Sequence, residues 1–442
     1  MVTPRAAVST VAFIDDYCQH YQKLFDDVRN FEAFKFLHLG VISEIPRKTL
    51  PAIARTVGLK DSQSLHHFLR DAVWDVNRVR EIRLWLTLLA IGDEEIVLCI
   101  DETGDKKKGK ATDYVARQYI GNLGKTENGI VSVNAYGVVN GITYPLLFKI
   151  FKPRSRLQAG DKYKTKPELA GEIIQELKAL GFKIKLVLAD SLYGESGDVI
   201  GILEKLNLQF IVAIRSNHTV LMSPGARVRY NRWHGYLQQL SHRQPEQRFI
   251  REIIFGKRRS LRYFQITKDD SPDPQGDNSW YIMTNLQGKI ETAIAQMYSM
   301  RMWIEYGFKQ VKNELGWADF RLTDYASISR WWEIVYSAYL LVSMQATSFQ
   351  KATVNTRQSS RKQQHIHNSQ MAEYNKHPWW ESGTTWKSTL NNLRLIIQPY
   401  IFYCLIQPWL QVFPIPGFRR CFLRLISIMN GFRASPLTTA AA

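Results

Sequence analysis

Two short runs that each end in an aspartate restrict the fold of this chain more than any other feature. They are IVLCID, residues 96–101, and KLVLAD, residues 185–190. A short apolar run followed by a carboxylate is typical of a buried strand that carries the acid at its C-terminal edge. We therefore expect Asp101 and Asp190 to lie at the same edge of one sheet.

The surrounding sequence predicts alternating β and α elements. Asn140-Gly141 joins two β-rich runs and is the strongest short-range signal for a hairpin. Thr165-Lys166-Pro167-Glu168 combines a capping box with a proline in the first turn, which predicts the start of a helix. The expected order is a strand at 96–101, a hairpin of 130–139 and 142–151, a helix to about residue 180, a strand at 185–190, a short helix, and a strand at 208–214.

A third acid, Glu305, lies in the aromatic and apolar run MWIEYGF, residues 302–308. At about 100° per residue, the side chains of a helix here form two stripes. The apolar stripe predicts packing against a core, and the polar stripe predicts the edge of that contact. A solvated or salt-bridged helix face would also explain the polar stripe. The polar stripe is Tyr298, Arg301, Glu305 and Lys312, and the apolar stripe is Ile304, Phe308, Val311 and Leu315.

Three carboxylates from two strands and one helix predict a metal site. Like charges a few ångströms apart raise one another's pKa unless a divalent cation lies between them, and Mg²⁺ prefers oxygen ligands. Two such ions can activate a water or a 3′-hydroxyl and stabilise the leaving oxygen of a phosphodiester. Each aspartate alone could be a turn or cap residue. Together with the order of the elements, the three acids favour a ribonuclease-H-like nuclease core.

The charge of the chain favours a polyanionic partner. The 442 residues carry a net charge of +18, and 45% of them are hydrophobic, which is enough for more than one core. Nucleic acid is the commonest partner of so basic a protein, although ribosome-associated and membrane-surface proteins share this charge. The sequence thus predicts a globular protein of several domains that binds nucleic acid.

The first 92 residues predict a separate module of short helices. Within it, residues 50–56 and 63–70 are expected helices, with a break at Gly58 and a capping candidate at Ser62. This is the arrangement of a helix-turn-helix, although ordinary helical hairpins share it. We expect a DNA-binding domain here.

A basic, strand-like segment at residues 217–276 predicts a β-rich insertion, with a turn at Gly256-Lys257. Residues 280–286 are its expected exit strand, and 328–350 are expected to be helical. Residues 351–388 are polar and read as a loop or linker. The apolar, uncharged run at 395–418 is interrupted by prolines and glutamines, so a membrane span is not expected.

The four cysteines are scattered and have no spacing that suits zinc, which favours a reducing compartment. The N-terminus shows no basic-then-apolar signal segment. We expect a cytoplasmic protein.

Three blocks of the sequence resemble those of the DDE transposases of bacterial insertion sequences. The blocks are CIDETG, LADSLYG and YSMRMWIEYGFKQVK. The last block is similar to the signature of one branch, because Tyr298, Arg301, Glu305 and Lys312 keep its spacing. SLHHFLRDAVWD also resembles the N-terminal helical block of such enzymes. The resemblance covers roughly residues 50–350 and does not extend to the tail.

The resemblance implies a role for each matching residue. Asp101, Asp190 and Glu305 would hold two Mg²⁺ ions, for which Mn²⁺ may substitute. Arg301 and Lys312 would bind phosphates near the transposon end, and Tyr298 would stack or hydrogen-bond beside the cleaved strand. Further backbone contacts are expected from basic residues that could singly be a solvated face. These are Lys106, Lys107, Lys108, Lys110, Arg258, Arg259 and Arg262; the acids Asp105, Asp113, Glu195 and Asp198 are left out of the site because none ends a buried strand.

The resulting hypothesis is a transposase that binds terminal inverted repeats of double-stranded DNA, cleaves the ends and joins the 3′-hydroxyls to target DNA. A homodimer on DNA and a nucleoid-associated location in a bacterial cytoplasm follow from the resemblance. The alternatives are a structure-specific nuclease on the same core and a non-catalytic DNA-binding protein. The expected fold is α/β, a ribonuclease-H-like mixed sheet flanked by helices. Its expected parts are an all-helical DNA-binding domain (1–92), a catalytic core in two parts (93–216 and 280–350), a β-rich insertion before the last catalytic helix (217–279), and a linker with an apolar C-terminal segment (351–442).

Overall fold

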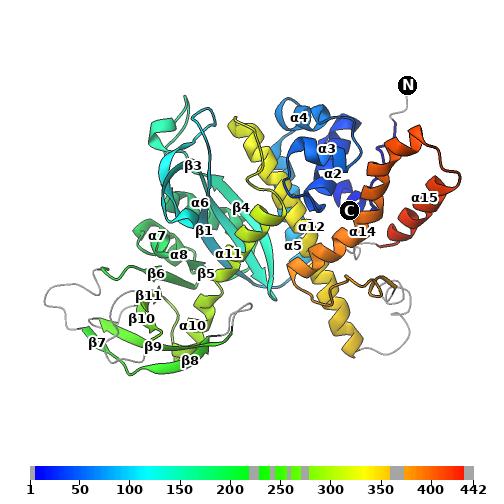
Figure 1. The fold of residues 1–442 in the computed structure, drawn as a ribbon. Coiled ribbons are helices and arrows are strands. Elements are labelled where there is room, and N and C mark those ends of the chain that lie inside the picture. Colours follow the sequence, from blue (N-terminus) through cyan, green and yellow to red (C-terminus); the bar gives the residue numbers. More distant parts are fainter. Residues whose placement is uncertain are drawn as a thin grey trace.

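The computed structural model describes residues 5–218, 228–238, 244–255, 260–269, 278–358 and 373–432. In this part of the chain, one mixed sheet is flanked by helices (Figure 1). The expected mixed α/β architecture is therefore confirmed. The path of hydrogen-bonded strands is β2-β3-β1-β5-β6-β11-β10-β9-β7, with β4 paired to β3 and β8 paired to β9.

The central strands follow the predicted order. Strand β1 pairs antiparallel with β3 and parallel with β5, and β5 pairs parallel with β6. The hairpin of β3 and β4 turns at Asn140 and Gly141, whose φ angles of 49° and 75° suit a tight hairpin turn. The bounds are β1 Ile96–Lys106, β2 Ala116–Ile120, β3 Lys125–Val139, β4 Ile142–Ile150, β5 Ile184–Ala189 and β6 Phe210–Ile214.

Strand β1 differs from the prediction, because it does not end at Asp101. It continues to Lys106, since its second half pairs with β3 as far as Gly129. The parallel pairing with β5 does end there, at Ile100 and Ala189. The aspartate is thus at the edge of the parallel ladder but in the middle of a longer strand.

The segment predicted to be a β-rich insertion contains strands that continue the main sheet, and its role as an insertion into a catalytic core stays a prediction. Strand β11 pairs antiparallel with β6, and Tyr281 lies opposite Ile214. Strands β10, β9 and β7 follow outward from β11 (Figure 1). The predicted turn at Gly256-Lys257 lies outside the described residues. The bounds are β7 Val228–Tyr230, β8 His234–Gln238, β9 Glu246–Phe255, β10 Arg262–Thr267 and β11 Ser279–Thr284.

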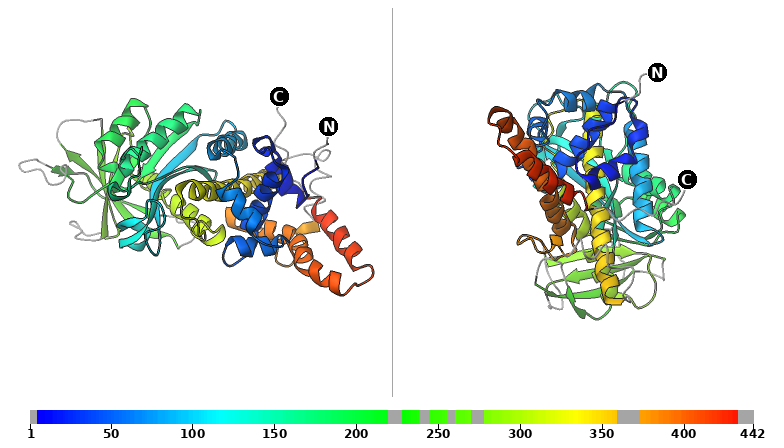
Figure 2. Two further views of the ribbon diagram at one scale, coloured as in Figure 1. Left: turned by 90° about the horizontal axis from the view of Figure 1, so that it is seen from above. Right: turned by 90° about the vertical axis from the view of Figure 1, so that its right-hand side faces the viewer.

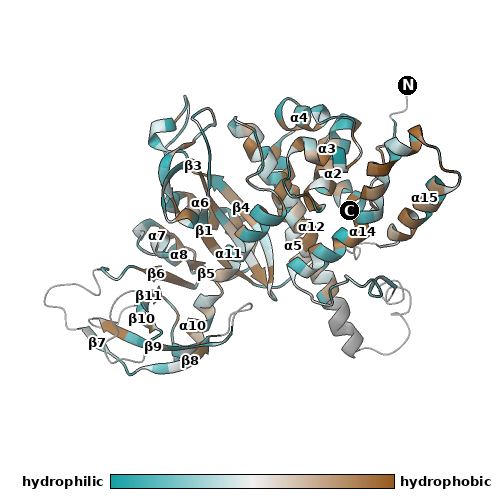
Figure 3. Ribbon diagram, viewed as in Figure 1, coloured by the Kyte–Doolittle hydropathy of each residue, from teal (hydrophilic) through white to brown (hydrophobic). Residues whose placement is uncertain are grey.

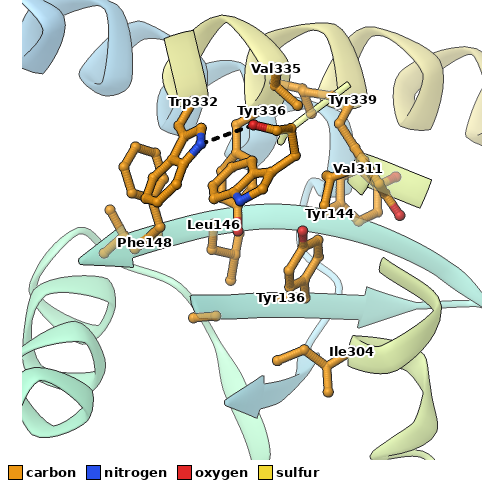
Figure 4. Close-up of a cluster of buried hydrophobic side chains, with 14 of the residues drawn as sticks. Tyr136, Tyr144, Leu146, Phe148, Ile304, Val311, Trp332, Val335, Tyr336 and Tyr339 are labelled. Carbon is orange, nitrogen blue, oxygen red and sulfur yellow. Dashed lines mark hydrogen bonds between the residues drawn. The ribbon is translucent and has the colours of Figure 1, made fainter. Parts of the chain in front are cut away.

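Helices cover both faces of the central strands (Figure 2). The long helix α12 (Tyr325–Gln358) packs on β4, and α6 (Lys166–Ala179) lies with α8 (Gly197–Lys205) on the other side. The capping box of Thr165 and Glu168 starts α6 as predicted. Aromatic side chains of β3 and β4 meet α12 in a buried cluster (Figure 4). Its ring contacts include Phe148 with Trp332 and Tyr136 with Tyr336.

The N-terminal helices are present as predicted. They pack against α12, which also packs on the sheet, so the helices and the sheet have a common hydrophobic core. Buried residues of both parts belong to one contiguous hydrophobic cluster. The Tyr17 hydroxyl donates to the backbone carbonyl of Ser337 at 2.9 Å, and His38 Nε2 lies 2.8 Å from the hydroxyl of Ser337. The domain border at residue 92 stays a prediction. The bounds are α1 Ala12–Gln19, α2 Val28–Ile42, α3 Leu50–Thr56, α4 Gln63–Arg70 and α5 Val76–Ile91.

The C-terminal segment forms a hairpin of α14 (Trp386–Val412) and α15 (Phe418–Met429), and both helices contain many hydrophobic residues (Figure 3). Some of the apolar side chains, such as that of Trp409, are exposed. Pro399 and Pro408 lie inside α14, so the prediction that prolines interrupt this segment is wrong for these two. Pro408 lies on an exposed turn, where water can bind the carbonyl that proline leaves free.

By length and composition α14 could cross a membrane, but core helices of soluble proteins can meet the same criterion. The expected linker after residue 350 begins as helix, because α12 runs to Gln358.

A buried ion pair joins the N-terminal helices to α12 and the sheet. Arg83 of α5 and Glu333 of α12 are both inaccessible to solvent and pair directly. Arg83 also donates to the carbonyls of Pro145 and Leu146 in β4, the second at 2.8 Å. These carbonyls are available because the β3–β4 ladder shifts register here, so that Leu146 has no partner opposite it.

Glu333→Ala is expected to lower the free energy of unfolding by about 3–5 kcal/mol, because it leaves the Arg83 guanidinium buried without a counter-ion. Denaturant unfolding followed by circular dichroism measures this change. The matched control is Glu81→Ala, which breaks an exposed pair with Arg78 and should cost at most about 1 kcal/mol. Equal losses in both variants would contradict the structural role of the buried pair.

The stability should also fall in mild acid through His38. Burial lowers the pKa of His38 to about 4, whereas an unfolded histidine titrates near pH 6.5. Between these values the unfolded chain binds more protons, so the stability contributed by the neutral ring is lost as pH falls from about 6.5 toward 4, by up to roughly 3 kcal/mol. His38→Gln should flatten this dependence in unfolding curves. A variant with the wild-type slope would show that other groups cause it.

Candidate active site

The pairing of β1 with β5 brings Asp101 and Asp190 together. Ile100 and Ala189 are the last paired residues of the β1–β5 ladder, so the two aspartates that follow them lie at the same edge of this ladder. Asp190 caps the short helix α7 (Ser191–Gly194), and its Oδ1 accepts from the Leu192 N–H at 2.9 Å. The predicted meeting of the two strand acids is therefore present.

The segment around Glu305 is three pieces, and the prediction of one helix is wrong. The pieces are α10 (Glu291–Ser299), α11 (Met302–Lys309) and a π-helical turn, η5 (Gln310–Glu314). The helix is interrupted at Met300 and Arg301, so Tyr298 and Glu305 lie on separate helices. The predicted apolar face is present, since Ile304, Val311 and Leu315 are buried.

Close packing on β3 positions α11. A Cβ on Gly307 would lie 2.8 Å from the ring of Tyr136, which is too close for any larger residue without movement. The glycine thus lets the helix approach the strand that lies beside β1.

Arg301 links the first and third acids. Its Nη1 lies 2.8 Å from Asp101 Oδ2, and its Nη2 lies 3.3 Å from Glu305 Oε1. The Glu305 side chain is 56% exposed, whereas that of Asp101 is 14% exposed. Arg301 is therefore the counter-ion of the mostly buried Asp101 carboxylate. It also contacts the exposed Glu305 carboxylate.

One cavity of about 520 Å³ contains all three acids. Lys312 lies at the same cavity, where its Nζ is 2.8 Å from Asp105 Oδ1 and donates to the Gly104 carbonyl at 2.8 Å. Asp105, which sequence reasoning left out, thus holds a predicted DNA-binding lysine. The charged and polar residues around the cavity are Asp101, Glu102, Thr103, Tyr119, Asn122, Asp190, Arg301, Glu305, Lys309, Lys312 and Asn313.

The electrostatics reflect crowded negative charge. Burial raises the pKa of Asp101 well above its ordinary value; the charge of Arg301 opposes this rise, and that of Asp190 adds to it. Burial likewise raises the pKa of Tyr298 to about 12. A carboxyl group in such surroundings ionises readily only when positive charge lies beside it.

The acids suit a hard divalent cation by their chemistry. All their donors are carboxylate oxygens, which Mg²⁺ and Mn²⁺ accept. Among the described residues, however, no three histidine, cysteine, aspartate or glutamate side chains are grouped so that they could hold an ion. Arg301 supplies the positive charge between Asp101 and Glu305 in this arrangement.

The other predicted basic residues are mostly held by protein partners. Lys106 pairs with Glu127 at 3.1 Å, and the Lys107 ammonium lies 3.5 Å from the centre of the Phe320 ring. Lys108 and Lys110 are exposed. Arg262 pairs with Glu252 at 2.7 Å, while Arg258 and Arg259 lie outside the described residues.

Of the remaining acids that sequence reasoning left out, Asp113 and Glu195 accept backbone hydrogen bonds from Tyr325 and Arg215. Asp198 is exposed on α8. Glu102 was missed, although it lies at the cavity directly after Asp101. Its position next to Asp101 was the available signal in the sequence. Its contact with Lys166 joins residues that are 64 positions apart, so no local pattern could predict it.

Comparison with known proteins connects this geometry to a family. A family model described as "DDE superfamily endonuclease" matches residues 21–249, a span that includes Asp101 and Asp190. The probable transposase for insertion sequence element IS701 of Microchaete diplosiphon is 57% identical over 330 residues. That alignment covers 74% of this chain and 86% of the relative.

Arg301→Met is expected to destabilise the protein in EDTA by about 1–3 kcal/mol, because Asp101 loses its counter-ion in a buried place. Thermal unfolding measures the change. Lys309→Met is the matched control, since Lys309 is exposed beside the same cavity and should alter stability little. An unchanged midpoint for Arg301→Met would show that the guanidinium does not offset the acids.

Proposed function

Because the chain belongs to the DDE superfamily of endonucleases and is a DNA transposase, we propose that Asp101, Asp190 and Glu305 are its catalytic residues. The proposed activity is to bind the terminal inverted repeats of an insertion sequence, hydrolyse phosphodiesters at its ends and join the 3′-hydroxyls to target DNA. The observation that carries the assignment is the shared cavity, which takes its three acids from β1, the end of β5 and α11.

Transposases of this family use divalent metal ions, and we propose two Mg²⁺ ions held by the three carboxylates, with Mn²⁺ as a substitute. When bound, the ions activate a water or a 3′-hydroxyl and stabilise the leaving oxygen. Arg301 now supplies the positive charge beside Asp101 and Glu305. The guanidinium of Arg301 could also bind a phosphate of the DNA through two parallel hydrogen bonds.

The DNA strand would enter along the exposed side of the cavity. Lys312 lies at its rim, and its ammonium group, held by Asp105, is placed to offset phosphate charge. Tyr298 is half-buried behind Arg301, so we assign it to orienting the guanidinium beside the cleaved strand. Exposed Lys106 and Lys108 are proposed backbone contacts, and Lys107 and the insertion residues Arg258 and Arg259 belong to the same proposal.

The same reasoning extends to the rest of the molecule. The order β4-β3-β1-β5-β6 supports a ribonuclease-H-like core. Helices α3 and α4 support a DNA-binding role for residues 1–92, because the exposed face of α4 carries His66, His67 and Arg70. A homodimer is proposed because two transposon ends must be handled together, and the proposed location is the bacterial nucleoid.

Cleavage of a labelled duplex that carries the element's end tests the assignment. Wild-type protein should nick the end in Mg²⁺ and not in EDTA. Glu305→Gln should bind the duplex normally and nick it roughly a hundredfold more slowly or worse, because metal-assisted charge stabilisation is worth several kcal/mol. Asp198→Asn, an exposed acid on α8, is the control that should cut at the wild-type rate.

A second labelled duplex in the reaction separates the alternatives. Joining of the cleaved 3′-end to this target supports the transposase, and cleavage without joining would favour a structure-specific nuclease. Binding without either reaction would favour a DNA-binding protein. A Glu305→Gln variant that cuts at the wild-type rate would refute the catalytic role of Glu305.

A further inference from the structure

A fourth acidic side chain, Glu102, lies beside the three catalytic acids. It follows Asp101 in β1, and its backbone N–H donates to Asp101 Oδ1 at 2.8 Å. Its side chain is only 10% exposed and borders the same cavity. The proposed reaction assigns it no role.

The two carboxylate oxygens of Glu102 have different surroundings. Oε1 accepts from Lys166 Nζ at 2.9 Å, and the lysine side chain is 16% exposed. Oε2 is buried and has no hydrogen-bond partner in the described part of the chain. A buried oxygen without a donor is costly, and native proteins usually satisfy such an atom with protein, water or an ion.

A second buried polar atom, on the residue three positions after Asp190, is also unsatisfied. The Tyr193 hydroxyl is fully buried and has no hydrogen-bond partner among the residues that the structure describes. Burial raises the pKa of Tyr193, and the charges of Asp101, Glu102 and Asp190 raise it further. The unsatisfied acceptor of Glu102, at the border of the cavity, indicates a species that the protein binds there.

We propose that Glu102 is a fourth carboxylate of the divalent-cation site and that Lys166 holds it in place. This inference rests on the proposed function, because it assumes that the cavity binds a cation. Lys166 is the first residue of α6, so its ion pair fixes one oxygen of Glu102 and leaves Oε2 for the cation or for a water bound to it. The alternative is an ion pair that only joins β1 to α6.

Titration calorimetry with Mn²⁺, on the full chain without DNA, separates these two roles. Glu102→Gln should weaken Mn²⁺ binding by roughly tenfold or more, the range found when groups that support a metal site are lost. The double variant Glu102→Gln with Lys166→Met removes both charges, so no lysine is left buried without a partner. It should bind Mn²⁺ as weakly as the single variant and unfold near the wild-type midpoint.

Glu127→Gln is the matched control, because Glu127 also pairs with lysines on the sheet but lies outside the cavity. It should bind Mn²⁺ like the wild type. Wild-type binding by the double variant would overturn the inference and leave Glu102 as a partner of Lys166 only. If the wild type does not bind Mn²⁺, or Asp101→Asn binds it equally well, the proposed metal site fails, and this inference fails with it.

Discussion

The buried contact of Arg83 with Glu333 is the interaction on which the arrangement of this protein depends. It begins with the β-bulge at Leu146, where the carbonyls of Pro145 and Leu146 accept from the guanidinium. Glu333 completes the coordination from α12. A single charged group therefore ties a helix of the N-terminal part, the long central helix and the sheet, and charges so buried are kept only when every partner is present.

Helix α12 in turn helps to position the segment that carries Glu305. Trp317, which follows the η5 turn, stacks on Trp332 of α12 with ring centres 4.2 Å apart, and its carbonyl accepts from the Trp332 indole at 3.2 Å. The segment that carries Glu305 is thus anchored to α12 at its C-terminal end and to Asp101, through Arg301, at its start. The position of Glu305 thus depends on aromatic packing after its helix and on the ion pair of Arg301 before it.

The parts of this structure that the sequence predicted are those with a local cause. Apolar strands, the Asn140-Gly141 turn and the capping box of α6 each act over a few residues, and the two strand acids followed from them. The break at Arg301 has no such local signal, and the guanidinium of Arg301 contacts a carboxylate 200 residues earlier in the chain. Strand β1 extends past Asp101 because β3 pairs with it, and α14 contains Pro408 on a turn that water can reach. None of these contacts has a sequence pattern.

The insertion between Asp190 and Glu305 enters through β6 and leaves through β11, and these two strands are hydrogen-bonded neighbours. Its two ends are therefore held at a fixed separation by the sheet itself, with Ile214 opposite Tyr281. Segments added or removed between such ends change the entropy of a closed loop only slowly with length. The segment between β6 and β11 can accordingly lengthen or shorten during evolution while the acids keep their positions in space.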